Sequence, residues 1–179
     1  CGLGRTGKWF VYQHAGVLPD VLTLAKGLAA GVPIGVCLAR GAAAGTFKPG
    51  NHGSTFGGNP LACAVALTTL ETIEQERLME NAERLGALLR SELAQALSSS
   101  KGVVDIRGRG LMVGVELDRP CADLVGLALE AGLLINVTAD KVIRLLPALV
   151  MNETEARTLV SILAPLVREF LLRPPAQAA

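Results

Sequence analysis

Aromatic residues are scarce in this chain, at 3% of its 179 residues, and neither sign of charge is in excess. Lysine and arginine total 17 residues, while aspartate and glutamate total 16. Proteins that bind nucleic acid or anionic membranes usually carry a clear positive excess, and single-stranded nucleic acid is bound on aromatic stacking platforms. The composition therefore argues against nucleic acid and against a membrane surface as the main partner.

Long hydrophobic runs are also missing. Glycine, proline or a charged residue interrupts every apolar stretch before it reaches the ~20 residues that a membrane-spanning helix needs. No secretory signal peptide is visible. Half of the residues are nevertheless hydrophobic, so a sizeable core is available. We expect a cytoplasmic protein, and a start at Cys1 without methionine indicates a piece of a longer one.

Metal-binding and disulfide patterns are absent as well. The four cysteines form neither a CxxC pair nor a cluster with histidine, and they stand at Cys1, Cys37, Cys63 and Cys121. Zinc sites and disulfide frameworks need such spacings or an extracellular context. We therefore expect no metal site and four reduced thiols without a catalytic role.

The first seven residues contain the spacing G-x-G-x-x-G, formed by Gly2, Gly4 and Gly7. A dinucleotide-binding loop with this spacing must follow a strand and open a helix. Here no strand precedes the glycines, and the following stretch KWFVYQ is aromatic and β-branched. We reject a nucleotide site and expect a tightly bent loop in which Arg5 and Thr6 make polar contacts.

Lys26 has unusual neighbours for a lysine. It follows the apolar run Val21–Ala25, and two glycines and a proline come soon after it. Apolar surroundings disfavour the ammonium form, and an unprotonated amine can attack an aldehyde. Lys26 is thus a candidate Schiff-base lysine; the alternative is a structural lysine whose stem lies along the end of a strand and whose amine reaches solvent.

Residues 1 to about 74 predict glycine-rich loops, short strands and one helix. Val21–Ala25 and Pro33–Ala39 are nearly continuous apolar runs, typical of strands that are covered on both faces. Asn59 followed by Pro60 is a typical helix start, because asparagine caps the first turn and proline fits its first position. The first half of that helix is apolar on all sides, so we expect it to be buried.

Residues from about 75 to 172 predict a compact α+β unit. Leucines and alanines recur at helical spacing over 77–97, and Leu111–Leu117 alternates as a strand with one buried face does. Further strands are expected over 103–107, 133–137 and 142–146.

Helix-boundary signals complete this region. We expect Asp118 to cap a helix that runs to about Ala131, and Asn152 with Glu155 to form a capping box for the last helix. Pro165 should kink or divide that helix. Residues 173–179 are expected to be disordered.

Five separated stretches resemble the class III pyridoxal-phosphate-dependent aminotransferases, in the order of that family. They are GLGRTGKWF, PDVLTLAKGLAAGVPIG, GNHGSTFGGNPLACA, RGRGLMVGVEL and INVTADKVIRLLPALVM. The resemblance implies an α/β fold: the C-terminal portion of a fold-type I transferase. Residues 1–74 would end the large domain that binds pyridoxal phosphate, and residues 75–172 would form the small C-terminal α+β domain.

The resemblance also implies roles for four residues. Lys26 matches the lysine that binds pyridoxal 5'-phosphate covalently and later moves a proton. Thr55 matches the threonine that holds the cofactor phosphate across the interface of a homodimer, and Ser54 matches a residue near the substrate. Considered without the resemblance, Ser54 and Thr55 have an alternative interpretation, as hydroxyls that only cap a loop.

Arg144 matches an arginine that receives a substrate carboxylate, and a glutamate from earlier in the chain masks that arginine in related enzymes. A charge in the apolar strand VIRLL is costly unless it meets an anion, and a guanidinium can grip a carboxylate with two hydrogen bonds. A structural ion pair is the alternative. The resemblance gives no catalytic part to His14, His52, Arg107 or Arg109.

Within the family, the LLINVTADKVIRLLPAL and FKPGNHGSTFGGNP stretches resemble enzymes of arginine biosynthesis that act on N-acetylornithine and 2-oxoglutarate. Ornithine, succinylornithine, 4-aminobutyrate and succinyldiaminopimelate remain alternative donors. Family enzymes are about twice this long, and their pyridinium-binding aspartate, phosphate loop and ring-stacking aromatic lie before the equivalent of Cys1. We therefore expect the chain alone to be inactive, and a truncated dimerisation module without catalysis is a further alternative.

Overall fold

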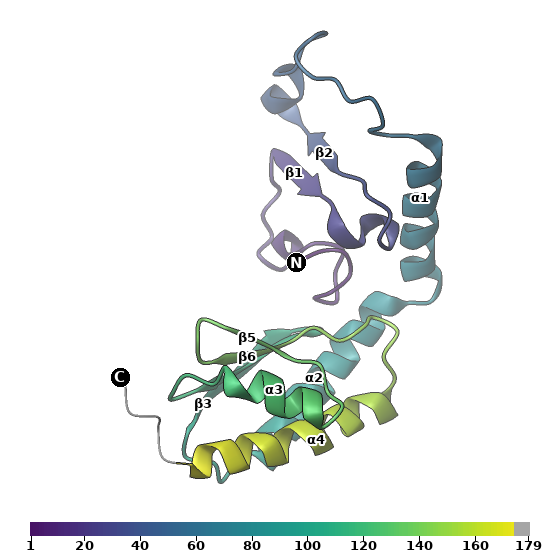
Figure 1. The fold of residues 1–179 in the computed structure, drawn as a ribbon. Coiled ribbons are helices and arrows are strands. Elements are labelled where there is room, and N and C mark those ends of the chain that lie inside the picture. The colour runs from purple at the N-terminus through teal and green to yellow at the C-terminus, as the bar shows by residue number, and fades with distance from the viewer. Residues whose placement is uncertain (174–179) are drawn as a thin grey trace. The chain divides into compact units, whose positions relative to one another are not determined.

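The computed structural model describes residues 1–173, which form two compact units (Figure 1). The N-terminal unit comprises Cys1–Gly4 and Lys8–Met79, and the C-terminal unit comprises Arg5–Gly7 and the chain from Glu80 onward. The disorder expected over 173–179 lies, except for Arg173, outside the described residues. The domain boundary between residues 74 and 75 stays a prediction, because it concerns the domains of a longer enzyme.

A two-stranded antiparallel sheet and one long helix form the N-terminal unit. Strands β1 and β2 pair so that Val21 lies opposite Ala39 and Leu24 opposite Val36. Asn59 caps helix α1 as expected, since its side chain accepts a hydrogen bond of 3.0 Å from the amide of Ala62. The elements are η1 (Val11–His14), β1 (Val21–Leu24), η2 (Lys26–Ala29), β2 (Val36–Ala39), η3 (Gly41–Gly45) and α1 (Pro60–Gln75).

The burial that the apolar runs predict for these strands and for the first half of α1 is not found within the described residues; an exposed apolar face is what we expect of a chain without the earlier half of a family enzyme. Val21 and Leu38 are 51% and 49% exposed, and on α1 Leu61 is 71% exposed. The unit's buried cluster is small and centres on Leu28, Ala29 and Ala66. An apolar run predicts burial against partner surfaces, and the described residues do not supply those surfaces for β1, β2 and the outer side of α1.

The C-terminal unit is a four-stranded antiparallel sheet covered by helices, with the strand order β3-β4-β6-β5. Its core joins one face of the sheet to side chains of all three long helices of this region, and α3 lies beside α4 (Figure 1). The elements are α2 (Leu78–Ala96), β3 (Val103–Arg109), β4 (Met112–Leu117), α3 (Asp123–Glu130), β5 (Asn136–Thr138), β6 (Val142–Leu145) and α4 (Glu153–Leu172).

The two periodic patterns of this region are confirmed. Along α2, the leucine and alanine positions of the helical stripe are buried, and Leu85, Leu89 and Leu93 are fully so. The alternating apolar residues along β4, together with the residue just before it, are also buried. They are Leu111, Val113, Val115 and Leu117. At 20–33 cal/mol per Å² of apolar surface removed from water, burial of this kind is the main stabilising contribution to such a unit.

Two helix predictions need correction. Helix α3 begins at Asp123 rather than after Asp118, because Pro120 interrupts the segment and the carboxylate of Asp118 is bound by the side chain of Arg119 at 2.7 Å. Helix α4 is continuous through Pro165, so the proline does not divide it. The capping box of Asn152 and Glu155 is present at its start, as expected.

Helix α2 approaches the β3–β4 turn very closely at Gly86. A Cβ atom at Gly86 would overlap the backbone of Gly110. Gly110 has a φ of 48°, and a Cβ there would lie 2.5 Å from the carbonyl oxygen of Arg5. Only glycine fits both positions without a shift of the backbone.

We predict that Gly86→Ala destabilises the protein by about 1–3 kcal/mol, because the methyl group pushes α2 away from the turn. The matched control is Gly126→Ala, since Gly126 lies in helix α3 and a Cβ there meets nothing within 4 Å. That change should stabilise by about 0.5–1 kcal/mol through helix propensity. Urea unfolding of both variants measures the difference; equal free energies of unfolding would contradict the close contact.

Candidate functional site

Lys26 has an unusual backbone conformation. It is the first residue of η2, and its φ of 52° lies in the left-handed region. Ala30, which ends η2, also has a positive φ, of 48°. Left-handed residues other than glycine cost of order 1–3 kcal/mol, and such strain gathers at functional sites. The short helical turn that carries Lys26 is thus strained at both ends.

The amine of Lys26 is exposed in this chain and makes no hydrogen bond or ion pair within residues 1–173. The apolar surroundings expected from its sequence neighbours are therefore not found among the described residues. Leu28 and Ala29 of the same turn are buried against α1, so the turn itself is anchored. Lys26 combines an anchored, strained backbone with an amine that has no hydrogen-bond or ion-pair partner among the described residues.

The loop with Ser54 and Thr55 lies between η3 and α1 and is fully exposed. The hydroxyl of Ser54 accepts a hydrogen bond of 2.9 Å from the amide of Gly57, so it caps a turn, as the loop interpretation predicts. Thr55 has no hydrogen bond within residues 1–173. Its hydroxyl is available to a ligand, whereas that of Ser54 already has a backbone partner.

The four predicted site residues lie in three separate segments of the described chain. Lys26 and the Ser54–Thr55 pair occupy separate segments of the N-terminal unit, while Arg144 belongs to the C-terminal unit. Their roles therefore stay predictions.

Arg144 lies on the solvent-exposed face of the sheet. In strand β6 its neighbours Ile143 and Leu145 are buried, and Arg144 alone is exposed. One guanidinium nitrogen donates a hydrogen bond of 3.1 Å to Oδ1 of Asn136 on β5. No carboxylate among the described residues pairs with it. Because Arg144 is exposed, its charge carries no burial cost in this chain. The alternative interpretation, a structural ion pair, is not found within the described residues.

Arg107 lies on strand β3, and two carboxylates neutralise its charge. Its guanidinium binds Asp105 at 3.0 Å and Glu116 at 2.7 Å, and Lys141 binds the same glutamate at 2.8 Å. The hydrogen bonds donated by Lys141 and Arg107 lower the pKa of Glu116, and those that Arg107 donates to Glu116 and Asp105 raise the pKa of Arg107. This cluster is a surface ion-pair network and leaves no cation free.

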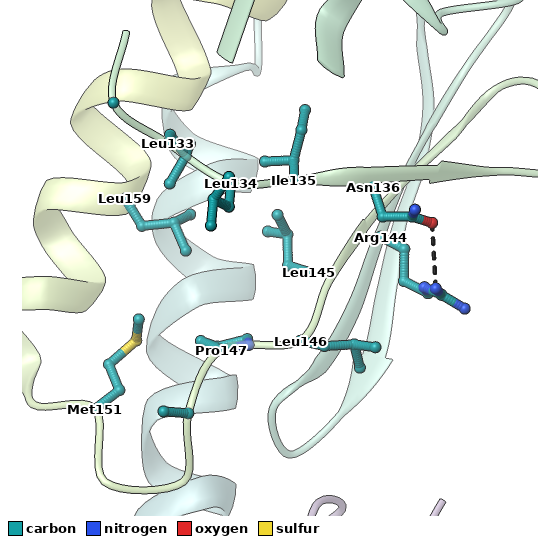
Figure 2. Close-up of a pocket in the computed structure, with 12 residues that line it drawn as sticks. Leu133, Leu134, Ile135, Asn136, Arg144, Leu145, Leu146, Pro147, Met151 and Leu159 are labelled. Carbon is teal, nitrogen blue, oxygen red and sulfur yellow. Dashed lines mark hydrogen bonds between the residues drawn. The ribbon is translucent and has the colours of Figure 1, made fainter. Parts of the chain in front are cut away.

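A cavity of about 500 Å³ lies beside β5 and β6. Figure 2 shows apolar side chains on its inner side, among them Leu133, Leu145 and Leu159, with Arg144 and Asn136 pointing the other way. Asn136 and Arg144 are nevertheless among the residues that line this cavity, and only their polar ends point away from its apolar side chains. We do not assign the cavity to the substrate carboxylate.

The segment Arg5–Gly7 packs on the C-terminal unit, although its chain neighbours belong to the N-terminal unit. The carbonyl of Arg5 accepts a hydrogen bond of 2.9 Å from the amide of Leu111, and its guanidinium donates to the carbonyl of Pro147. Burial lowers the pKa of Arg5. Thr6 is 3% exposed. The polar contacts expected of this loop exist, but only the folded chain shows that they join residues 142 positions apart.

Other candidate groups are unremarkable. His52 packs edge-on against Phe47, with ring centroids 4.7 Å apart. Residues 1–173 contain no cluster of three or more histidine, cysteine or acidic side chains that could hold a metal ion. Across the same residues, no helix has the length and apolar character to cross a bilayer.

Residues 1–167 match the family model described as aminotransferase class III. The chain belongs to the class III aminotransferase family. The resemblance drawn from the five motifs is thereby confirmed.

Individual proteins with similar sequences are aminotransferases too. The chain is 59% identical over 170 residues to acetylornithine aminotransferase 1 of Bordetella pertussis. The aligned region covers 95% of this chain but only 43% of that protein. It is 57% identical to the acetylornithine aminotransferase of Nitrosomonas europaea, over 96% of this chain and 44% of that protein. The chain thus spans less than half the length of these relatives.

Solved structures of family members have the same fold. The acetylornithine aminotransferase of Elizabethkingia anophelis matches with a TM-score of 0.86 at 40% identity, over 94% of this chain and 46% of that one. The ornithine aminotransferase of Toxoplasma gondii matches with a TM-score of 0.88 at 40% identity, over 94% and 41%. The α/β fold expected for part of a transferase is confirmed.

We predict that Arg5→Ala destabilises the aminotransferase by about 1.5–3 kcal/mol, the usual range for a lost charged hydrogen bond. The matched control is Lys8→Ala, because Lys8 is exposed and its amine makes one long contact of 3.4 Å, to the carbonyl of Gln13. Chemical denaturation measures both. If Arg5→Ala unfolds no more easily than Lys8→Ala, the hydrogen bond to Pro147 does not contribute to stability.

Proposed function

We propose that this chain supplies part of the active site of an aminotransferase that transfers the amino group of N-acetylornithine to 2-oxoglutarate. The products are N-acetylglutamate 5-semialdehyde and glutamate, a step of arginine biosynthesis. The observation that carries the donor assignment is the 57–59% identity to acetylornithine aminotransferases over nearly the whole chain. We also propose that the enzyme is located in the reducing cytoplasm.

Lys26 would hold the cofactor of this enzyme. Enzymes of the family use pyridoxal 5'-phosphate, whose ring, when bound, would delocalise the electron pair left on the donor's α-carbon after a base removes the proton. The residues present fit this group, because Lys26 offers an amine without a competing partner and Thr55 a hydroxyl without one. Lys26 would bind the cofactor aldehyde, and once released by the donor its amine would take the α-proton.

Thr55 would donate its hydroxyl to the cofactor phosphate. A hydroxyl on an exposed, glycine-rich loop can approach an anion closely. The family resemblance assigns this contact to the partner subunit's active site, so a homodimer would be the functional unit. Ser54 would line the substrate region while its hydroxyl oxygen still accepts the hydrogen bond from the amide of Gly57 that caps the turn.

Arg144 would bind a carboxylate of 2-oxoglutarate and of glutamate. Its guanidinium has five N–H donors, of which the bond to Asn136 uses one. The remaining donors can form the paired hydrogen bonds that a carboxylate accepts. Arg144 has no anionic partner among the described residues, and the glutamate that masks the matching arginine in related enzymes would come from the earlier part of the enzyme.

We predict that Arg144→Ala lowers kcat/KM for 2-oxoglutarate about 10- to 100-fold, as loss of 1.5–3 kcal/mol of charged hydrogen bonding implies. The assay uses the full-length enzyme that contains this chain. Arg109→Ala is the control. Arg109 is also an exposed arginine of the sheet, but it lies at the end of β3, opposite Met112 in the strand register. Equal losses in the two variants would contradict the assignment.

The donor is tested on the same enzyme. We predict the highest kcat/KM for N-acetylornithine among N-acetylornithine, ornithine, succinylornithine, 4-aminobutyrate and succinyldiaminopimelate. Similarity to ornithine aminotransferase structures favours ornithine as the second candidate. No turnover of N-acetylornithine, with turnover of another donor, would overturn the substrate and leave the family unchanged. The alternative of a module without catalysis concerns this chain alone: pyridoxal phosphate and borohydride added to the purified chain should give a mass adduct on Lys26, and its absence would support that alternative.

A further inference from the structure

Asn136 lies directly opposite Arg144 in the antiparallel pair of β5 and β6. Opposite residues in such a pair point to the same face of the sheet, and their side chains interact. Oδ1 of Asn136 accepts a hydrogen bond of 3.1 Å from a guanidinium nitrogen of Arg144, as Figure 2 shows. The partner that holds this arginine is therefore a neutral amide.

Gly114 lies on the other side of Arg144, opposite it on β4, and opposite Arg107 on β3 as well. The row across the sheet thus reads Arg107, Gly114, Arg144 and Asn136. A Cβ at Gly114 would lie 3.3 Å from the side chain of Val142. Since Gly114 has no side chain, nothing on β4 reaches across to neutralise Arg144.

The two arginines of this row have different hydrogen-bond partners. Arg107 is held by the carboxylates of Asp105 and Glu116, both on the same face. Arg144 is held by an amide oxygen and has no carboxylate partner among residues 1–173. Within the described residues, the row thus leaves the charge of Arg144 without a carboxylate partner, while the bond to Asn136 orients its side chain.

We propose that Asn136 is a positioning residue for the substrate carboxylate. Its neutral oxygen orients the guanidinium of Arg144 and leaves the positive charge available to one carboxylate of 2-oxoglutarate. This inference rests on the proposed function, because it takes Arg144 as the carboxylate-binding group. It adds that selectivity for an anionic substrate depends on the absence of charge at position 136.

The decisive variants are Asn136→Asp and Asn136→Ala in the full-length holoenzyme. Aspartate has nearly the size of asparagine and keeps the accepting oxygen, but it places a negative charge where the substrate carboxylate is recognised. We expect Asn136→Asp to raise KM for 2-oxoglutarate about tenfold or more, because a competing carboxylate neutralises Arg144. Asn136→Ala should raise it by less, roughly threefold, because only orientation is lost.

The order of the two variants separates this role from a merely structural one. If Asn136 only stabilised the sheet, alanine would be the more harmful change, since aspartate preserves both shape and hydrogen bond. Thr138→Asp is the charge control, because Thr138 lies on the same strand and face, opposite Val142. It adds the same charge one row away and should change KM less than Asn136→Asp does.

A second readout is the half-reaction with the amino donor, followed by the change in cofactor absorbance. Its rate should change much less in Asn136→Asp than KM for 2-oxoglutarate does. The inference is overturned if Asn136→Asp leaves that KM within about threefold of wild type while Arg144→Ala raises it tenfold or more. If neither Arg144→Ala nor Asn136→Asp changes KM, the role proposed for Arg144 fails as well.

Discussion

The two-residue alternation of strand β4 is the constraint on which the C-terminal unit depends. Val113, Val115 and Leu117 enter the core, and the intervening residues Gly114 and Glu116 therefore face the other side. Because β4 pairs with both β3 and β6, this choice also turns Arg107 and Arg144 outward. A slip of one residue would bury both arginines, so the core determines where the charged face lies.

The N-terminal unit is built on a different principle. Its buried cluster is small, but η2 is anchored by Leu28 and Ala29, and the backbone at Lys26 is held in a conformation that lysine rarely adopts. Strain of this kind persists only where neighbouring structure enforces it. In our account the enforced conformation presents the amine of Lys26, while the exposed loop beyond β2 presents the hydroxyl of Thr55.

Local patterns predicted the elements well, because short-range rules generate them. The stripe along α2, the alternation of β4 and the caps at Asn59 and Asn152 all follow from spacing and residue type. The apolar runs of the N-terminal unit do not find burial within the described residues, since an apolar run does not say whether its partner surface lies within the same chain. The start of α3 was missed because Pro120 and the Arg119–Asp118 contact override the cap expected at Asp118.

The candidate site was predictable in its residue types and not in its pairings. The lysine, the loop hydroxyls and the arginine stood out by neighbourhood and by resemblance. The bond between Arg144 and Asn136 depends on strand register, and that between Arg5 and Pro147 joins distant segments. Neither the left-handed φ of Lys26 nor the neutral partner of Arg144 has a sequence signal, because both arise from how the folded backbone is arranged.

The central claim is that Lys26 is the lysine to which the cofactor binds. It is tested most directly by loading the full-length enzyme with pyridoxal 5'-phosphate, reducing it with borohydride and mapping the modified peptide by mass spectrometry. The account predicts one stoichiometric pyridoxyl adduct, on Lys26, which is lost in Lys26→Ala. A stoichiometric adduct on another lysine, such as Lys48, with Lys26 unmodified, would contradict it.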